Sequence, residues 1–245
     1  MSVYDASTYG ERIADVYDEW YSELDTTGAI DFLAQLSGPG PVLELGIGTG
    51  RVALPLAERG IEVHGIDSSE SMVAKLRAKP GGDRIPVTVG NMADVNVEGE
   101  FSLIAVTFST IFSLLTQEEQ LRCFRNVAAR LSDEGLYVVE AFLPDPARFD
   151  RGQRVGLGRW ELDQVVLEVS KHDPTRQRVD SHHVVLSEEG IKFYPVRIRY
   201  AWPGELDLMA QLAGLKLRER WGGWRREPFT ASSIWHVSVY ERAGI

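Results

Sequence analysis

Apolar positions recur in two different patterns between residues 42 and 142. Short β-rich runs alternate with stretches in which apolar residues recur every three or four positions, the spacing of an amphipathic helix. The runs end near residues 45, 67, 90, 108 and 142, and the helical stretches cover 50–59, 69–79 and 117–131. This alternation predicts βαβ units on a parallel, doubly wound α/β sheet.

The pattern differs on both sides of this region. Residues 11–21 and 27–36 have helical spacing, whereas residues 157–202 alternate between apolar and polar positions and contain two turn signals. We expect three antiparallel strands there, followed by a helix over 204–215 and two closing strands. The expected organisation is a helical lid (1–37), a ligand-binding core (38–150), an inserted antiparallel β subdomain (151–203) and a C-terminal helix with closing strands (204–245).

The charge balance narrows the range of partners. The chain has 26 basic and 36 acidic residues, a formal net charge of -10, so its field disfavours nucleic acid and anionic membrane surfaces. One cysteine, Cys123, indicates a reducing cytoplasm, and the acidic N-terminus does not have the pattern of a signal peptide. The most apolar window, 101–115, is too short to span a bilayer.

A glycine loop follows the first core strand. Gly46, Gly48 and Gly50 free the backbone for positive φ angles, and the next helix offers unpaired N–H groups to a ligand, although a tight structural turn would use the same residues. A dinucleotide loop requires a third glycine where this chain has Arg51. Asp67 ends the next strand and suits the hydroxyls of an adenosine ribose, or it caps the following helix together with Ser68.

The Gly-x-Gly-x-Gly loop preceded by Glu44 resembles that of class I S-adenosylmethionine-dependent methyltransferases. The resemblance implies a Rossmann-like seven-stranded sheet and S-adenosylmethionine as cofactor, with S-adenosylhomocysteine as product. It places the methionine half on the loop, its amino group near Glu44 and the adenine near Asn91. The full set of cofactor-binding residues that we expect is Tyr17, Glu44, Gly46, Gly48, Gly50, Arg51, Asp67, Ser68, Met72, Asn91, Met92 and Phe108.

Three features narrow the resemblance to bacterial small-molecule enzymes such as amino-sugar N-methyltransferases. These features are the aromatic lead "YGERIADVYDEWY", the "FSTI" stretch after the fourth strand and the β insertion. In the resembled enzymes a tyrosine of the lead reaches the cofactor carboxylate, although Tyr17 and its neighbours also have the spacing of packed helical residues. The analogy also suggests a homodimer.

Methyl transfer from a sulfonium is an in-line displacement, which needs alignment more than any particular side chain. We expect Tyr9 and His182 to act in catalysis, with packing as the alternative for His182. His182 and His183 are adjacent on a strand, so only one of them can face the active site. No cysteine or histidine cluster has metal-ligand spacing.

These observations predict an enzyme that methylates N or O of a small metabolite. A nicotinamide-dependent oxidoreductase on a similar sheet and a non-catalytic S-adenosylmethionine-binding protein are the alternatives. The position of Arg51 in the loop favours the methyltransferase over the oxidoreductase.

Overall fold

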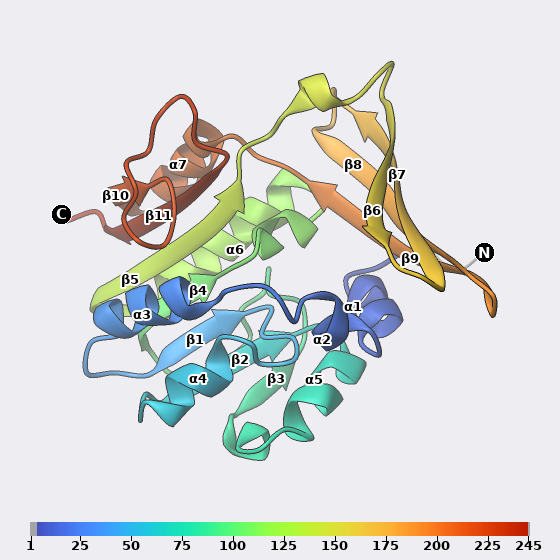
Figure 1. Ribbon diagram of the computed structural model, residues 1–245. Coiled ribbons are helices and arrows are strands. Elements are labelled where there is room, and N and C mark those ends of the chain that lie inside the picture. The colour runs from blue at the N-terminus through green and yellow to red at the C-terminus, as the bar shows by residue number, and fades with distance from the viewer. Residues whose placement is uncertain (1–3, 245) are drawn as a thin grey trace.

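The computed structural model describes residues 4–244, and a seven-stranded mixed sheet forms their centre (Figure 1). Its strands are β1 (Val42–Leu45), β2 (Val63–Asp67), β3 (Val87–Val89), β4 (Phe101–Val106), β5 (Leu131–Phe142), β10 (Leu215–Trp221) and β11 (Trp235–Arg242). They lie in the order β10-β11-β5-β4-β1-β2-β3, and β11 runs antiparallel to both of its neighbours. The sheet confirms the predicted Rossmann-like, seven-stranded architecture.

Helices cover both faces of this sheet. The helices of one face are α3 (Thr27–Leu36), α4 (Ala53–Glu58) and α5 (Glu70–Arg77), and those of the other are α6 (Gln117–Arg130) and α7 (Pro203–Leu212). Three short 3-10 helices, η1 (Gly82–Arg84), η2 (Thr110–Ser113) and η3 (Pro146–Arg148), lie in connections. Thr116 and Glu119 form a capping box at the start of α6, which fixes where that helix begins.

The insertion is a second, four-stranded antiparallel sheet at one end of the core sheet (Figure 1). It consists of β6 (Gln153–Trp160), β7 (Gln164–Asp173), β8 (Arg178–Ser187) and β9 (Gly190–Arg199). The expectation of three strands was wrong, because one predicted strand contains a hairpin turn with a fully exposed Leu162. The turn lacks the glycine and proline signals that mark the other two.

The N-terminal lead forms two short helices, α1 (Thr8–Ile13) and α2 (Tyr17–Trp20), where the sequence predicted one helix over 11–21. Contacts with the core explain the break, because Asp18 accepts a hydrogen bond from the Thr49 hydroxyl and pairs with Lys79. Tertiary contacts therefore override the local helical spacing. Among the described residues, no helix is long and apolar enough to cross a membrane.

Candidate active site

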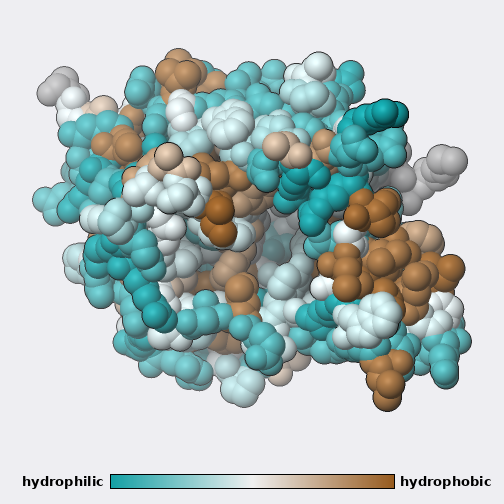
Figure 2. All heavy atoms as spheres, turned by 45° about the horizontal axis from the view of Figure 1, so that its top comes forward, coloured by the Kyte–Doolittle hydropathy of each residue, from teal (hydrophilic) through white to brown (hydrophobic). Residues whose placement is uncertain are grey.

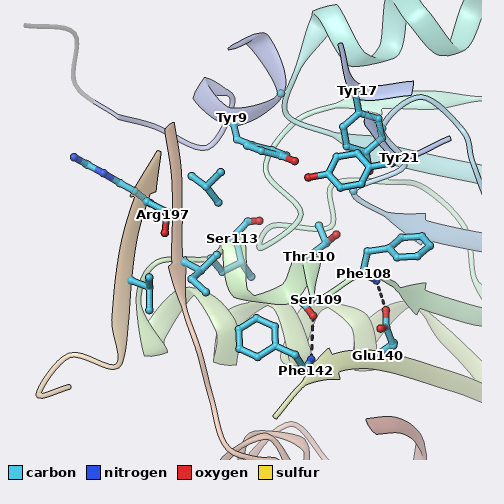
Figure 3. A pocket seen from close by; sticks show the side chains of 18 of the residues that line it. Tyr9, Tyr17, Tyr21, Phe108, Ser109, Thr110, Ser113, Glu140, Phe142 and Arg197 are labelled. Carbon is cyan, nitrogen blue, oxygen red and sulfur yellow. Dashed lines mark hydrogen bonds between the residues drawn. The ribbon is translucent and has the colours of Figure 1, made fainter. Parts of the chain in front are cut away.

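A cavity of about 740 Å³ opens where β1, β2, β4 and β5 end, in the size range of small-molecule sites. The carboxyl ends of these strands form its floor, α1 and α2 cover it, and the four-stranded sheet closes one side (Figures 1 and 3). The core, the N-terminal lead and the insertion therefore all contribute to one cavity.

The glycine loop lies at the floor of the cavity. Gly46, Gly48 and Gly50 have φ angles of 72°, 54° and 81°, which residues with a Cβ rarely adopt. A Cβ on Gly46 would overlap the Thr110 methyl group, so glycine is needed there for packing as well. Gly46 and Gly48 border the cavity, whereas Gly50 packs under the loop against Leu76.

Asp67 connects this loop to the end of β2. One carboxylate oxygen accepts from the Gly48 N–H at 2.8 Å, and the other accepts from the Ser69 N–H at 2.8 Å. Burial raises the pKa of Asp67, although the amide hydrogen bonds from Ser69 and Gly48 oppose the rise. The side chain is thus fixed at the cavity wall, as a ribose-binding carboxylate would need to be.

The N-terminal cap of α5 is not the one suggested by the sequence, which was Asp67 together with Ser68. Ser69, not Asp67 or Ser68, is the N-cap, and its hydroxyl accepts from the Met72 N–H. Ser68 borders the cavity and donates its hydroxyl hydrogen to the carbonyl of Ala6 at 2.8 Å. This bond ties the N-terminal segment to the strand end.

Three of the expected cofactor-binding residues border the cavity beyond β2 and β3: Met72, Asn91 and Met92. The side-chain oxygen of Asn91 accepts from the Ala93 N–H at 2.9 Å, which fixes the amide. Its second lone pair remains available to a ligand donor. The two thioethers supply polarizable apolar contacts.

Glu44 does not border the cavity, in contrast to the expectation of contact with the cofactor amino group. It lies beneath the loop, where the Ala53 amide and the Thr107 hydroxyl donate to it, and its Oε2 has no partner among the described residues. Burial raises its pKa to about 8, against these two hydrogen bonds. The side chain points into the sheet face covered by α4, so its contacts stabilise the loop from below.

Arg51 is the cationic group of the cavity wall nearest the loop. Its guanidinium lies 5.0, 5.2 and 5.6 Å from the ring centres of Tyr17, Tyr21 and Phe108, and it donates to the Tyr21 carbonyl. Aromatic faces hold a guanidinium in place without neutralising it. A carboxylate of a bound ligand can therefore pair with Arg51.

Tyr9 and Tyr21 point their hydroxyl groups toward one another across the top of the cavity (Figure 3). Burial, and next the neighbouring tyrosines, raise the pKa of Tyr9 well above its ordinary value, and burial raises the pKa of Tyr17 to about 12. Both phenols are neutral near pH 7. They can orient a ligand through hydrogen bonds, but they are poor proton acceptors.

Glu140, a buried residue near the end of β5, borders the cavity but was not among the residues predicted from the sequence. Its Oε2 accepts from the Phe108 N–H (Figure 3), and its backbone carbonyl accepts from the Ser109 N–H at 3.2 Å. Phe108 and Ser109 have φ angles of 52° and 59°, so Glu140 holds an uncommon left-handed turn. The signal in the sequence was an acidic residue in the apolar run "VVEAF".

One face of the four-stranded sheet contributes polar and apolar side chains to the cavity, and we call it the inner face of the sheet. Strand pairing places Glu168 beside His183 and Ser170 beside Ser181 on this face. His182 also borders the cavity, but strand alternation puts its side chain on the opposite face, in register with Val169. His183 therefore occupies the position that we expected for His182.

Comparisons with known proteins agree with this geometry. A methyltransferase domain profile matches residues 42–135. The solved CcbJ methyltransferase from Streptomyces caelestis is 47% identical, with a TM-score of 0.92 over 98% of this chain and 100% of that one. The cypemycin N-terminal methyltransferase of a Streptomyces species is 29% identical over 97% of this chain and 99% of its own length.

More distant structures share the fold alone. CalS10, an amino pentose methyltransferase from Micromonospora echinaspora with S-adenosylmethionine bound, is 19% identical, with a TM-score of 0.67 over 99% of each chain. The matches do not favour an oxidoreductase or a non-catalytic binding protein. The glycine loop, the fixed Asp67 and the 47% identity together place the chain in a family. It belongs to the class I S-adenosylmethionine-dependent methyltransferases.

Proposed function

We propose that this methyltransferase acts on an amine nitrogen of a small polar molecule bound between the core and the inner face of the four-stranded sheet. The observation that carries the proposal is Glu140, a buried carboxyl on the cavity wall with backbone amides as its partners. An ammonium group of the acceptor would supply the missing cation. The cypemycin enzyme, named for methylation of an N-terminus, and CalS10, named for an amino pentose, support this choice.

The proposed cofactor contacts follow from the cavity wall. Asp67 accepts hydrogen bonds from the ribose hydroxyls, Arg51 and Tyr17 bind the carboxylate, and Met72 with Asn91 contacts the adenine. Gly46 and Gly48 leave room for the methionine portion, and Met92, Ser68 and Phe108 complete the wall. Glu44 and Gly50 act from below the loop, by holding its shape.

S-adenosylmethionine supplies a methyl group on a sulfonium for direct displacement. An amine attacks only through a free lone pair, so an acceptor that arrives as an ammonium ion must first lose a proton. Burial raises the pKa of Glu140 to about 7, which suits a group that takes this proton near neutral pH. The neutral Tyr9 hydroxyl orients the acceptor, and His182 has no role in this scheme.

We further propose that the enzyme is cytoplasmic and that its substrate is a metabolite. The single cysteine and the acidic composition support a cytoplasmic enzyme that acts on a metabolite and not on nucleic acid. The carboxyls of Glu140 and Glu168 on the cavity wall would likewise repel phosphate groups.

A matched panel of acceptors tests the nitrogen specificity. Small primary and secondary amines and their hydroxyl analogues are incubated with the enzyme and S-adenosylmethionine, and mass spectrometry detects methylated products. We expect methylated amines and unchanged hydroxyl analogues, because the alcohols bring no cation to Glu140. Transfer to hydroxyl groups at equal or higher rates would contradict the proposal, while leaving the methyltransferase assignment intact.

A further inference from the structure

Three aromatic side chains form a row beside the cavity, where β5 and β11 pair. Phe112 contacts Phe142 at 5.0 Å between ring centres, and Phe142 contacts Trp235 at 6.3 Å, both edge to face. We call these three residues the aromatic row. Phe112 is completely buried, Phe142 is half-buried and Trp235 is 42% exposed. Phe142 and Trp235 both border the cavity, so the row runs from the core to the cavity wall.

Strand register places the aromatic row next to Glu140. Glu140 and Phe142 are two residues apart on β5, so their side chains project from the same face of that strand, roughly 7 Å apart. On β11, Val237 is the partner of Glu140, and Trp235 is the partner of Phe142. Figure 3 shows Glu140 and Phe142 side by side on this strand, at the cavity. A buried carboxyl and an apolar surface are therefore neighbours on the cavity wall.

The proposed cofactor contacts leave this surface free. Those contacts come from the glycine loop, the lead and the ends of β2, β3 and β4, whereas Phe142 and Trp235 lie at the ends of β5 and β11. Figure 2 shows that the molecule is hollowed near its centre and that apolar side chains, in brown, lie along the hollow. An exposed tryptophan on a cavity wall offers apolar area that a ligand can remove from water.

We propose that the methyl acceptor carries an apolar ring a few bonds from its amine nitrogen, and that this ring binds against Phe142 and Trp235. The inference rests on the proposed function, because it takes the amine to be held by Glu140. Strand geometry sets the spacing, since a nitrogen at Glu140 and a ring at Phe142 are at most roughly 7 Å apart. A linker of about two carbon atoms spans this separation.

The geometry of the row suits a planar ring. The ring planes of Phe142 and Trp235 are 88° apart, so the pair forms a corner that can offer an incoming ring an aromatic edge and an aromatic face. A ring bound in this corner also displaces water from beside Glu140. Loss of that water strengthens the attraction between the carboxylate and the ammonium group of the acceptor, because the local dielectric falls.

Calorimetry with defined amines tests this subsite in the enzyme saturated with S-adenosylhomocysteine. The probes are phenethylamine, which has a phenyl ring two carbon atoms from its nitrogen, and ethylamine, which has no ring. We expect phenethylamine to bind about tenfold more tightly than ethylamine or better, since burial of a phenyl group favours binding. Equal affinities for the two amines, or no binding of phenethylamine, would overturn the proposal.

The variant Trp235→Ala tests where the ring lies. It removes one side of the corner and leaves Glu140 in place, so it should weaken phenethylamine about fivefold and leave ethylamine unchanged. Trp202→Ala is the matched control, because Trp202 is 46% exposed at the start of α7 and does not border the cavity. An equal loss for both amines in Trp235→Ala would count against the subsite. Binding of S-adenosylhomocysteine checks the fold, and Trp235→Leu replaces any variant that fails this check.

Phenethyl alcohol separates the subsite from the proposed function. This probe has the ring but no cation, so Trp235→Ala should weaken it as much as the amine, whereas Glu140→Gln should weaken only the amine. If the alcohol binds as tightly as the amine and responds to Trp235→Ala, the role of Glu140 in amine binding fails and the ring subsite stands. If Trp235→Ala changes neither probe, the ring subsite fails and the amine function stands.

Fluorescence quenching locates the ring independently. The bromine of para-bromophenethylamine quenches a tryptophan that it contacts, and Trp224 and Trp235 are the two tryptophans among the described residues that border the cavity. Trp235→Phe retains an aromatic ring, so this variant should still bind the probe but lose most of the saturable quenching. Trp224→Phe should keep it. Loss of quenching in Trp224→Phe and not in Trp235→Phe would place the ring elsewhere on the wall and overturn the proposal.

Discussion

Asp67 and Glu140 differ in how much of each carboxylate remains for a ligand. Both oxygens of Asp67 accept backbone N–H groups, so this side chain is fixed before any ligand arrives. Glu140 Oε2 accepts from the Phe108 N–H, and among the described residues no other side chain bonds to the Glu140 carboxyl. The first arrangement suits a fixed binding group and the second a group that exchanges a proton.

The proposed role of Glu140 predicts a change in the pH profile. The base works when deprotonated, so kcat/KM of the wild type should rise with pH through a midpoint near 7, the pKa of Glu140 in the free enzyme. The midpoint of kcat should lie lower, since a bound cation lowers a carboxyl pKa. Glu140→Gln keeps an acceptor for the Phe108 N–H but cannot titrate, so its profile should lose this rise and its kcat should fall about 10²-fold.

Glu134→Gln, an exposed change on the same strand, is the control and should leave the profile unchanged. The role proposed for Glu140 would be wrong if Glu140→Gln retained the wild-type midpoint. If Glu140→Gln lowered kcat but left the pH profile unshifted, Glu140 would have only a structural role, in holding the turn at Phe108.

At the element scale, a buried ion pair joins the four-stranded sheet to the core. Arg199 at the end of β9 lies 2.6 Å from Glu205 on α7, and the Gln120 amide donates to the Arg199 carbonyl. Gln177 also donates to Glu205, at 2.8 Å. Removing one member of such a pair leaves an uncompensated charge in a buried place.

Arg199→Met should therefore lower the free energy of unfolding by about 3–5 kcal/mol, measured by urea denaturation. Arg122→Met breaks an exposed pair of similar length, 2.8 Å to Asp94, and should cost at most about 1 kcal/mol. Equal losses of unfolding free energy in Arg199→Met and Arg122→Met would show that burial of the Arg199–Glu205 pair does not increase its effect on stability. Adding Glu205→Gln to Arg199→Met should recover part of the loss.

The sequence predicted the parts of the site that are local in the chain. The glycine loop and Asp67 lie within one βαβ unit, so strand ends and spacing were enough to place them. Arg51 and Glu140 acquire their surroundings from Tyr17 and Phe108, which are distant in sequence, and no periodicity encodes such contacts. The sequence did not predict the turn between β6 and β7, because residues 161–163 contain neither glycine nor proline and Asp163 is the one common turn residue among them.

At the scale of the whole molecule, the cavity depends on three separate parts of the chain meeting. The Trp20 ring packs against His183 and Tyr194 on the inner face, 5.7 and 4.9 Å away between centres, and Arg159 donates to the Trp20 carbonyl. The lead thus contacts the insertion across the cavity, while Asp18 and Ser68 tie the lead to the core. The lead, the insertion and the core thus each cover part of the site.

Calorimetric titration with S-adenosylhomocysteine tests the cofactor site on which the whole account depends. We predict one micromolar site per chain and no binding of NAD or NADP. Asp67→Asn should weaken the affinity about tenfold or more, the loss expected for a charged hydrogen-bond partner, while Asp94→Asn on the surface leaves it unchanged. The absence of binding to the wild type, or a preference for a nicotinamide dinucleotide, would contradict the account.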